Sequence, residues 1–187
     1  TATQGSDFSA SSTVSIPAGQ TSATFTVTAI DDSVYEGDET GTITISSVSN
    51  PNVSTSSSNA ATLTITDNER EPTVTLSRDN ATVSEDGGTS TLTATLSGKT
   101  YADVTVTLSD SGTATSGTDY SYTGSITISA GSLTGTDTFT STADDVFDAA
   151  SAESATIAIS GVSGGSASES GTQSVAIAIT DAESAPT

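Results

Sequence analysis

The chain has 187 residues, of which 23 are Asp or Glu and only 3 are Lys or Arg, so its formal net charge at pH 7 is -20. It contains no His and no Cys, which excludes Ser-His-Asp and Cys-His catalysis as well as imidazole and thiolate metal sites. So large a negative charge repels nucleic acid and anionic membranes and attracts cations, and no apolar stretch is long enough for membrane insertion.

Short stretches in which apolar residues alternate with Thr or Ser run through the whole chain. A period of two is typical of half-buried antiparallel strands, and no segment has the period of a helix. Turns rich in Gly, Asn and Asp separate these stretches, so we expect an all-β protein built from sandwiches. In chain order, the expected strands are residues 23–30, 41–46, 61–66, 90–97, 103–109, 124–129 and 174–180.

The sequence also repeats itself at an offset of 112 to 114 residues. The segment "TATQGSDFSASSTVSIPAG" at 1–19 returns as "TATSGTDYSYTGSITISAG" at 113–131, and "ITDNEREPT" at 65–73 returns as "ITDAESAPT" at 179–187. Self-similarity at a fixed offset indicates copies of one module. The expected domains are a partial first repeat, residues 1–72, and a complete second repeat, residues 73–187.

The first copy begins in its middle, because residues 74–112 have no counterpart before Thr1. A sandwich without these roughly three N-terminal strands would expose its core and an unpaired edge. One explanation is that the chain is an excerpt of a longer repetitive protein. The other is that a neighbouring molecule donates the strands, which would make the module a self-polymerising filament subunit. Both explanations predict the same kind of partner, a neighbouring repeat of the same or an identical chain.

Acidic residues recur at the ends of the expected strands in both copies. Strand ends meet at the poles of an antiparallel sandwich, and two carboxylates 4 Å apart repel by about 4 kcal/mol at an effective dielectric of 20. A hard cation such as Ca²⁺, which takes 6 to 8 oxygen ligands, would relieve that repulsion. Isolated acids such as Asp79, Asp103 and Asp137 are instead interpreted as solubility groups.

The motifs that carry these acids resemble the Calx-beta module. They are "GSDF", "IDDSVYEGDE" and "ITDNE" in the first copy, and "GTDYSYTGSITISAG", "ADDVFD" and "ITDAE" in the second. The resemblance implies an Ig-like antiparallel sandwich of about seven strands that binds Ca²⁺ through loops at one end. The metal ligands that it implies are Asp7, Asp31, Asp32, Glu36, Glu39 and Asp67 in the first copy, and Glu85, Asp119, Asp144, Asp145, Asp148 and Asp181 in the second.

The two copies depart from this pattern in different ways. In the second, "DAASAES" replaces "EGDET", so Glu153 aligns with Glu39 only across an insertion, and we expect a weaker or smaller site there. The first copy lacks the segment that would carry its counterpart of Glu85, so its site is expected to be incomplete.

These observations predict a binding and structural module, not an enzyme. The expected function is that of a calcium-binding repeat in a secreted or cell-surface stalk, adhesin or filament, in which Ca²⁺ stiffens loops and joints between repeats. One alternative is a calcium-sensing regulatory module, which would need micromolar affinity and a conformational response. Another is an adhesin tip that binds carbohydrate or ice through Thr-rich strand faces. The sequence identifies no external ligand.

Overall fold

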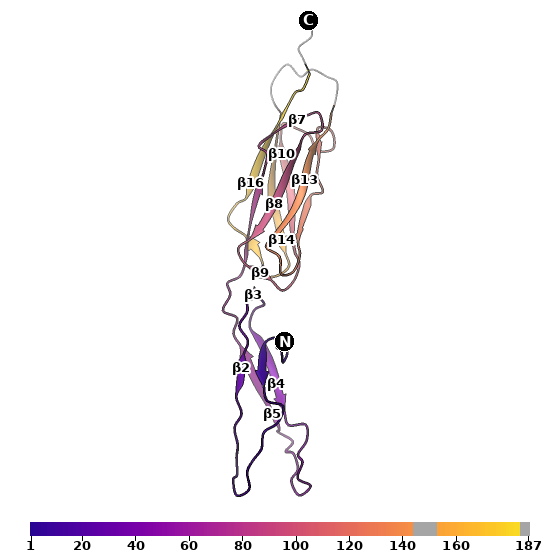
Figure 1. The fold of residues 1–187 in the computed structure, drawn as a ribbon. Helices are drawn as coiled ribbons and strands as arrows, with labels where there is room; N and C mark the ends of the chain where they lie inside the picture. The colour runs from indigo at the N-terminus through magenta and orange to yellow at the C-terminus, as the bar shows by residue number, and fades with distance from the viewer. Residues whose placement is uncertain (144–152, 184–187) are drawn as a thin grey trace. The chain divides into compact units, whose positions relative to one another are not determined.

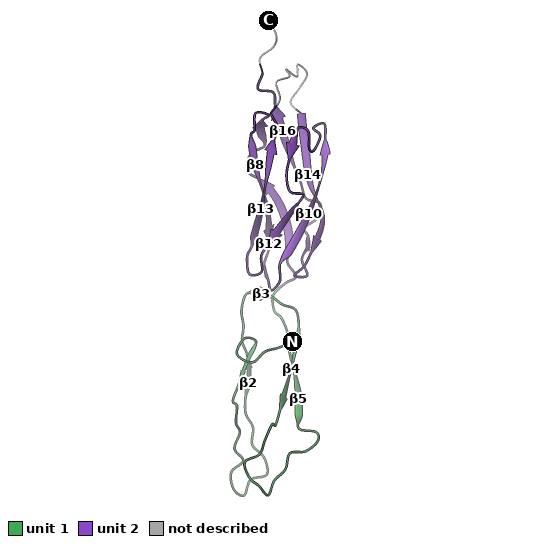
Figure 2. Ribbon diagram, turned by 90° about the vertical axis from the view of Figure 1, so that its right-hand side faces the viewer, with its two compact units in different colours: residues 1–69 green, residues 70–187 purple. Residues whose placement is uncertain are grey.

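The computed structural model describes residues 1–143 and 153–183. The chain divides into two compact units, Thr1–Glu69 (unit 1) and Arg70–Thr187 (unit 2), which are coloured separately in Figure 2. The described residues form strands, turns and loops without a helix, which confirms the all-β prediction. No helix long and apolar enough to cross a membrane occurs among them.

Unit 2 is a sandwich of two five-stranded sheets (Figure 1). Its strands alternate between buried apolar and exposed or half-buried Thr and Ser side chains, as the period of two predicts. One sheet has the order β12-β10-β14-β16-β7, with β7 (Thr82–Ser84), β10 (Val104–Gly112), β12 (Ser125–Ile128), β14 (Glu153–Ser163) and β16 (Ser174–Thr180). The other has the order β11-β13-β8-β6-β15, with β6 (Thr73–Arg78), β8 (Thr89–Leu96), β11 (Tyr120–Ser121), β13 (Thr134–Ser141) and β15 (Ser168–Glu169). Strand β9 (Lys99–Thr100) lies between β8 and β10 in the chain.

The sandwich is antiparallel except at two short edge strands, where β7 pairs with β16 and β15 pairs with β6 in parallel. The first of these arises because the chain leaves β6 and crosses to the other sheet as β7. Asp79 stabilises the segment between β6 and β7, because its Oδ1 accepts hydrogen bonds from the backbone N–H groups of Asn80 and Thr91, each at 2.7 Å. One continuous stretch of chain therefore contributes a strand to each sheet.

The core of unit 2 lies between its two sheets. Tyr120 and Phe139 are fully buried, and their rings stack with centroids 4.6 Å apart. The hydroxyl groups of Tyr120 and Tyr122 both donate to the carboxylate of Asp110, at 2.8 and 2.7 Å, so the buried phenol has a partner. The other fully buried apolar residues include Val74, Leu92, Val104, Val106, Ile126, Ile128, Ile157 and Ile177.

Unit 1 is less enclosed. It consists of two antiparallel pairs, β1 with β2 and β4 with β5, and the short strand β3. Phe8 is the only buried large hydrophobic side chain among the described residues of this unit. The strands are β1 (Phe8–Ala10), β2 (Val27–Ala29), β3 (Val34–Tyr35), β4 (Glu39–Thr44) and β5 (Ala60–Ile65).

Backbone geometry shows which strands of the two units correspond. Asp7 and Asp119 each accept a hydrogen bond from the backbone N–H four residues earlier, at 2.5 and 2.6 Å. Glu39 and Glu153 both lie opposite the isoleucine of an "ITD" motif in the neighbouring strand. Strands β1, β2, β4 and β5 of unit 1 are therefore the equivalents of β11, β13, β14 and β16 of unit 2.

Candidate metal site

A hollow in unit 1 collects the acidic side chains that the sequence singled out. All six predicted ligands of the first copy line it. They come from four loops, because antiparallel strands bring their ends together at one pole. Asp7 precedes β1, Asp31 and Asp32 follow β2, Glu36 and Glu39 lie between β3 and the start of β4, and Asp67 follows β5.

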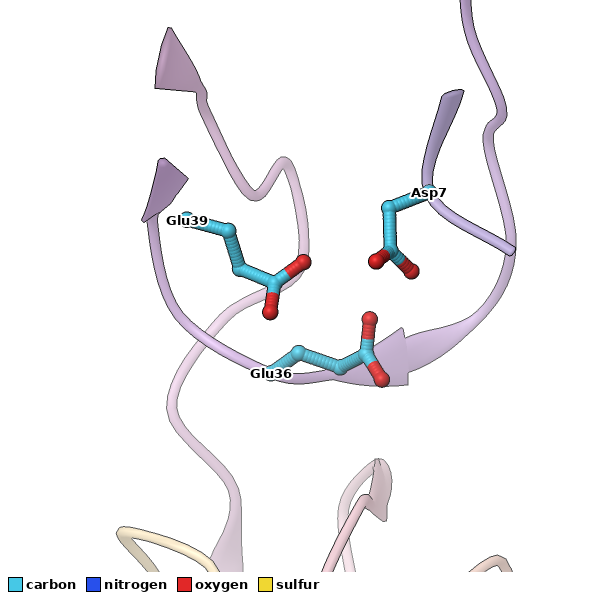
Figure 3. A group of neighbouring side chains, drawn as sticks. All are labelled: Asp7, Glu36 and Glu39. Atoms are coloured by element: carbon cyan, nitrogen blue, oxygen red, sulfur yellow. The ribbon is translucent and has the colours of Figure 1, made fainter. Parts of the chain in front are cut away.

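Three of these carboxylates form a tight group. Asp7, Glu36 and Glu39 each offer one oxygen, and these oxygens all lie within 4.8 Å of one another. Figure 3 shows the three side chains extending toward a common space, Glu36 and Glu39 from one loop and Asp7 from another stretch of chain. The group therefore brings three carboxylates from two loops to one place.

Asp67 holds the loop that carries the two glutamates. Its Oδ2 accepts the backbone N–H groups of Glu36 at 2.6 Å and Gly37 at 2.5 Å, and its Oδ1 accepts that of Glu69 at 2.9 Å. Its own N–H donates to Asp38 Oδ1 at 3.1 Å. Burial alone would raise the pKa of Asp67, but these backbone donors outweigh it and lower the pKa. Asp67 thus stays ionised and fixes the position of the ligand loop.

The pKa of Glu36 is shifted in the opposite direction from that of Asp67. Burial raises the pKa of Glu36, and the negative charges of Asp32, Asp7, Glu39 and Asp67 raise it further. A carboxylate in such surroundings is stabilised either by a proton or by a cation that offsets the neighbouring charges. The crowding of acids in the hollow is therefore electrostatically unfavourable without a bound positive charge.

The donor set of the hollow fits a hard divalent cation, because every candidate ligand is a carboxylate oxygen. Asp7, Glu36 and Glu39 would hold the ion, and Asp31 and Asp32 line the same hollow. Asp32 is partly committed elsewhere, since its Oδ1 accepts the N–H of Val34 at 2.7 Å.

A second carboxylate group lies in unit 2, where the oxygens of Glu85, Asp181 and Glu183 are within 4.8 Å of one another. Glu85 Oε1 accepts the N–H of Ala182 at 3.1 Å, and Asp181 Oδ1 accepts the N–H of Glu183 at 2.7 Å. A hydrogen bond to the Glu85 side chain, together with burial and the nearby charges, raises the pKa of Glu183 to about 7. Glu183 therefore keeps its proton to a higher pH than an ordinary glutamate does.

The structure brings together only some of the metal ligands that were predicted in the second copy. Glu85 and Asp181 come together, whereas Asp119 is half-buried and lies outside the carboxylate groups found among residues 1–143 and 153–183. Asp144, Asp145 and Asp148 lie outside the described residues.

The predicted set of metal ligands leaves out three acids at the same strand ends. Asp38 and Glu69 hydrogen-bond with Asp67, and Glu183 completes the carboxylate group in unit 2. The signal that could have found Glu183 is the motif "ITDxE", because its final Glu occurs at the same place in both copies.

The fold and the acidic pole define a class of protein, that of β-sandwich repeats with carboxylate-lined loops at a strand end. Residues 71–182, more than half of the chain, match the family model of the LapA domain, so the chain belongs to the LapA domain family. Residues 1–69 match the model of the Calx-beta domain, which confirms the resemblance seen in the sequence.

One solved structure supports the same fold. The apo form of the Calx CBD1 domain is 20% identical, with a TM-score of 0.51, and the match covers 61% of this chain and 100% of that one. The CBD12 structure from CALX1.2 is 21% identical, with a TM-score of 0.49, over 58% of this chain and 44% of that one. At 20% identity, the match to the CBD1 domain establishes the fold alone. No curated protein matches the chain.

Proposed function

We propose that the chain is a calcium-binding structural repeat of a secreted or cell-surface protein of the stalk, adhesin or filament kind, and that it is not an enzyme. The observation that carries this proposal is the hollow of unit 1. Seven acidic side chains from four loops line it, and the oxygens of Asp7, Glu36 and Glu39 lie within 4.8 Å of one another. A solvated acidic surface does not require its carboxylates to converge in this way.

Calcium is the ion that the donor set favours. Ca²⁺ takes 6 to 8 oxygen ligands in flexible geometry and accepts bidentate carboxylates, backbone carbonyls and water, whereas Mg²⁺ requires a near-ideal octahedron. The ligands lie on loops that meet only in the folded state, so binding stabilises that state by RT ln(1 + [L]/Kd). For a site filled at about 10 to 100 times its Kd, this contribution is about 1–3 kcal/mol.

A structural role at the cell surface is supported by three further features. The chain carries two copies of one module, and repeated sandwiches in tandem form extended arrays. It lacks the His and Cys side chains on which most hydrolytic and redox sites depend. Membership of the LapA domain family, with a Calx-beta match in unit 1, supports an adhesin-type parent protein.

The test is calorimetric titration of the intact chain with Ca²⁺ after treatment with a chelator. The unmodified chain is expected to release heat and to gain thermal stability, and Mg²⁺ at the same concentration should bind more weakly. Glu36→Gln removes one ligand charge and should weaken the unit 1 site at least about tenfold, equivalent to 1.4 kcal/mol.

The matched control is Asp103→Asn, directly before β10 in unit 2. It removes the same charge outside the unit 1 hollow and keeps an acceptor for the N–H of Ala130. This variant should titrate like the unmodified chain. If the unmodified chain gives neither heat nor a thermal shift with Ca²⁺, the calcium-site proposal fails.

A further inference from the structure

The outer face of one sheet of unit 2 carries only Thr and Ser side chains on its three longest strands. In β6, β8 and β13 every second residue points into the sandwich, and the residues in between point outward. None of the outward residues is charged, although the chain has a formal net charge of -20. These outward residues, called here the threonine face, are Thr73, Thr75 and Ser77 in β6, Thr89, Thr91, Thr93 and Thr95 in β8, and Thr134, Thr136, Thr138 and Thr140 in β13.

Strand pairing arranges the threonine face in rows. Strands β8 and β13 lie side by side (Figure 1), and on the far side of β8 the residues Thr75 and Ser77 of β6 extend two of the rows. Neighbouring strands are about 4.8 Å apart and alternate residues of one strand about 6.8 Å apart, so the face is a two-dimensional grid. The pairs across β13 and β8 are Thr134 with Thr95, Thr136 with Thr93, Thr138 with Thr91, and Thr140 with Thr89.

Strand propensity alone does not explain this grid. Thr is common in strands and Ala is not, yet Ala158, Ala176 and Ala178 occupy outward positions in β14 and β16 of the other sheet. The same preference acts on both sheets, but only one of them has unbroken rows of Thr. The row of β13 also recurs in the first copy, where "TFTVT" at 24–28 corresponds to "TFTST" at 138–142.

The hydroxyl groups of the grid are open to an external ligand. Thr is β-branched, so the rotation of its side chain is restricted and its methyl and hydroxyl groups point in few directions. The face therefore repeats the same two groups at fixed spacings. Within the described parts of the chain, 1–143 and 153–183, no hydrogen bond occupies the hydroxyl groups of Thr93, Thr95, Thr134, Thr136, Thr138 and Thr140.

We propose that the threonine face binds the surface of ice. Identical groups at regular spacings suit a ligand that is itself periodic, and an ice surface is a lattice of water molecules. Two oxygens that are hydrogen-bonded to one water at about 2.75 Å, in tetrahedral geometry, lie about 4.5 Å apart, which is close to the spacing of neighbouring strands. Sugars pack well against aromatic side chains, and the grid has none.

The twist of the sheet limits how much ice one face can bind. Neighbouring strands are rotated by about 20–25°, so the match is best between two adjacent strands, and the Thr residues of β8 and β13 form the main contact. A contact of this size binds weakly by itself, but repeated copies of the module in one polypeptide would strengthen it by avidity. Ice binding is separate from the proposed cation site, whose candidate ligands lie in unit 1.

The test grows ice slowly on a cold probe in a dilute solution of the intact chain and measures the fraction of protein that the ice takes up. A globular protein without a regular Thr face is the reference, because growing ice excludes ordinary proteins. The unmodified chain is expected to be enriched in the ice over this reference. Thr136→Lys places a long charged side chain in the middle of the grid and should lower uptake to the reference level.

The matched control is Thr127→Lys, which makes the same change at an exposed Thr of β12 in the other sheet and should keep the uptake of the unmodified chain. Circular dichroism of each variant shows whether unit 2 is folded, and Thr93→Lys repeats the test on β8 if Thr136→Lys folds poorly. Exclusion of the unmodified chain from ice overturns the proposal, as does full uptake of a folded Thr136→Lys chain. Binding to insoluble cellulose or chitin in place of ice, lost in Thr136→Lys, would also overturn it.

Discussion

Asp67 illustrates how a single residue prepares a binding site without being its central ligand. Its two oxygens accept three backbone N–H groups, two of them from the loop that presents Glu36 and Glu39. Gly37 has a φ of +74°, which only glycine adopts at little cost, so this close turn depends on both residues. The backbone therefore positions the candidate ligands Glu36 and Glu39 without an ion, which would lower the entropy cost of ordering them when a cation binds.

A pH dependence follows from Glu183, whose pKa is raised from 4.5 to about 7 by its hydrogen bond to Glu85 and by burial. A carboxyl group with a raised pKa in the folded state stabilises that state fully below pH 4.5. This contribution is lost as the pH rises through about 7. In the presence of a chelator, the unfolding midpoint of unit 2 is therefore expected to fall between these two pH values. Amide signals of β14 and β16 would follow it.

The variant Glu183→Gln resembles the protonated acid and should flatten that fall. Asp103→Asn, which removes an equal charge from the other end of the sandwich, should keep it. Asp79 does not change the stability of unit 2 in this pH range, because backbone N–H donors lower its pKa from 3.8. Its contribution to stability is lost only below that value. An unchanged pH profile in Glu183→Gln would contradict the raised pKa of Glu183.

The site residues that recur as motifs could be predicted from the sequence, whereas the way in which one of them acts could not. Asp7, Asp31 and Asp32 are visible because short motifs repeat around strand ends. The role of Asp67 as a loop anchor is not visible, because it depends on N–H groups about 30 residues away in the chain. Sequence spacing alone carries no information on that approach.

At the scale of strands and turns, Gly112 ends β10 where the chain turns away from β14. Its φ is +132°, and a Cβ atom there would lie 2.1 Å from the carbonyl oxygen of Ser154. Gly117, in the following loop, has a φ of +84° and open space around its missing Cβ. Both positions have a positive φ that favours glycine, but only at Gly112 would a side chain also collide with the backbone.

Gly112→Ala is therefore expected to destabilise unit 2 by about 3 kcal/mol or more, since it combines backbone strain with a backbone collision. Gly117→Ala should cost about 1–2 kcal/mol, the penalty for a left-handed conformation alone. Urea denaturation of both variants measures the difference. Equal losses would mean that β10 and β14 can separate slightly at this position without penalty.

The strands that could be predicted are those with partners in the chain. Residues 124–129 and 174–180 form β12 and β16 almost as expected, because both strands pair with neighbouring strands of their sheet. The stretch 23–30 has the same alternation, but only Val27–Ala29 forms a strand. Alternation indicates which face would be buried, but the strand forms only where another strand satisfies its backbone. The parallel pairing of β7 was missed because it results from a crossing between sheets, which local periodicity does not encode.

At the scale of the whole molecule, the two units differ in how much apolar surface they bury. Unit 2 encloses a continuous cluster that includes Tyr120, Phe139 and Leu92, whereas Phe8 is the only buried large hydrophobic residue among residues 1–69. Because burial of apolar area is the main source of folding free energy, the two copies of one module should have very different stabilities. A single melting temperature would then describe unit 2 rather than the whole chain.

This difference predicts two levels of amide protection in the intact chain in the presence of a chelator. Amides of β10 and β14 should exchange only through global unfolding of unit 2. Those of β4 and β5 should exchange at least about a hundredfold faster, because a local opening of unit 1 costs several kcal/mol less. Addition of Ca²⁺ should slow exchange at Gly37 and Glu69, whose N–H groups are held by Asp67, more than in the middle of β5. Equal protection in β4 and β14 without calcium would contradict this prediction. It would mean that residues 1–69 are stabilised by more than their own packing.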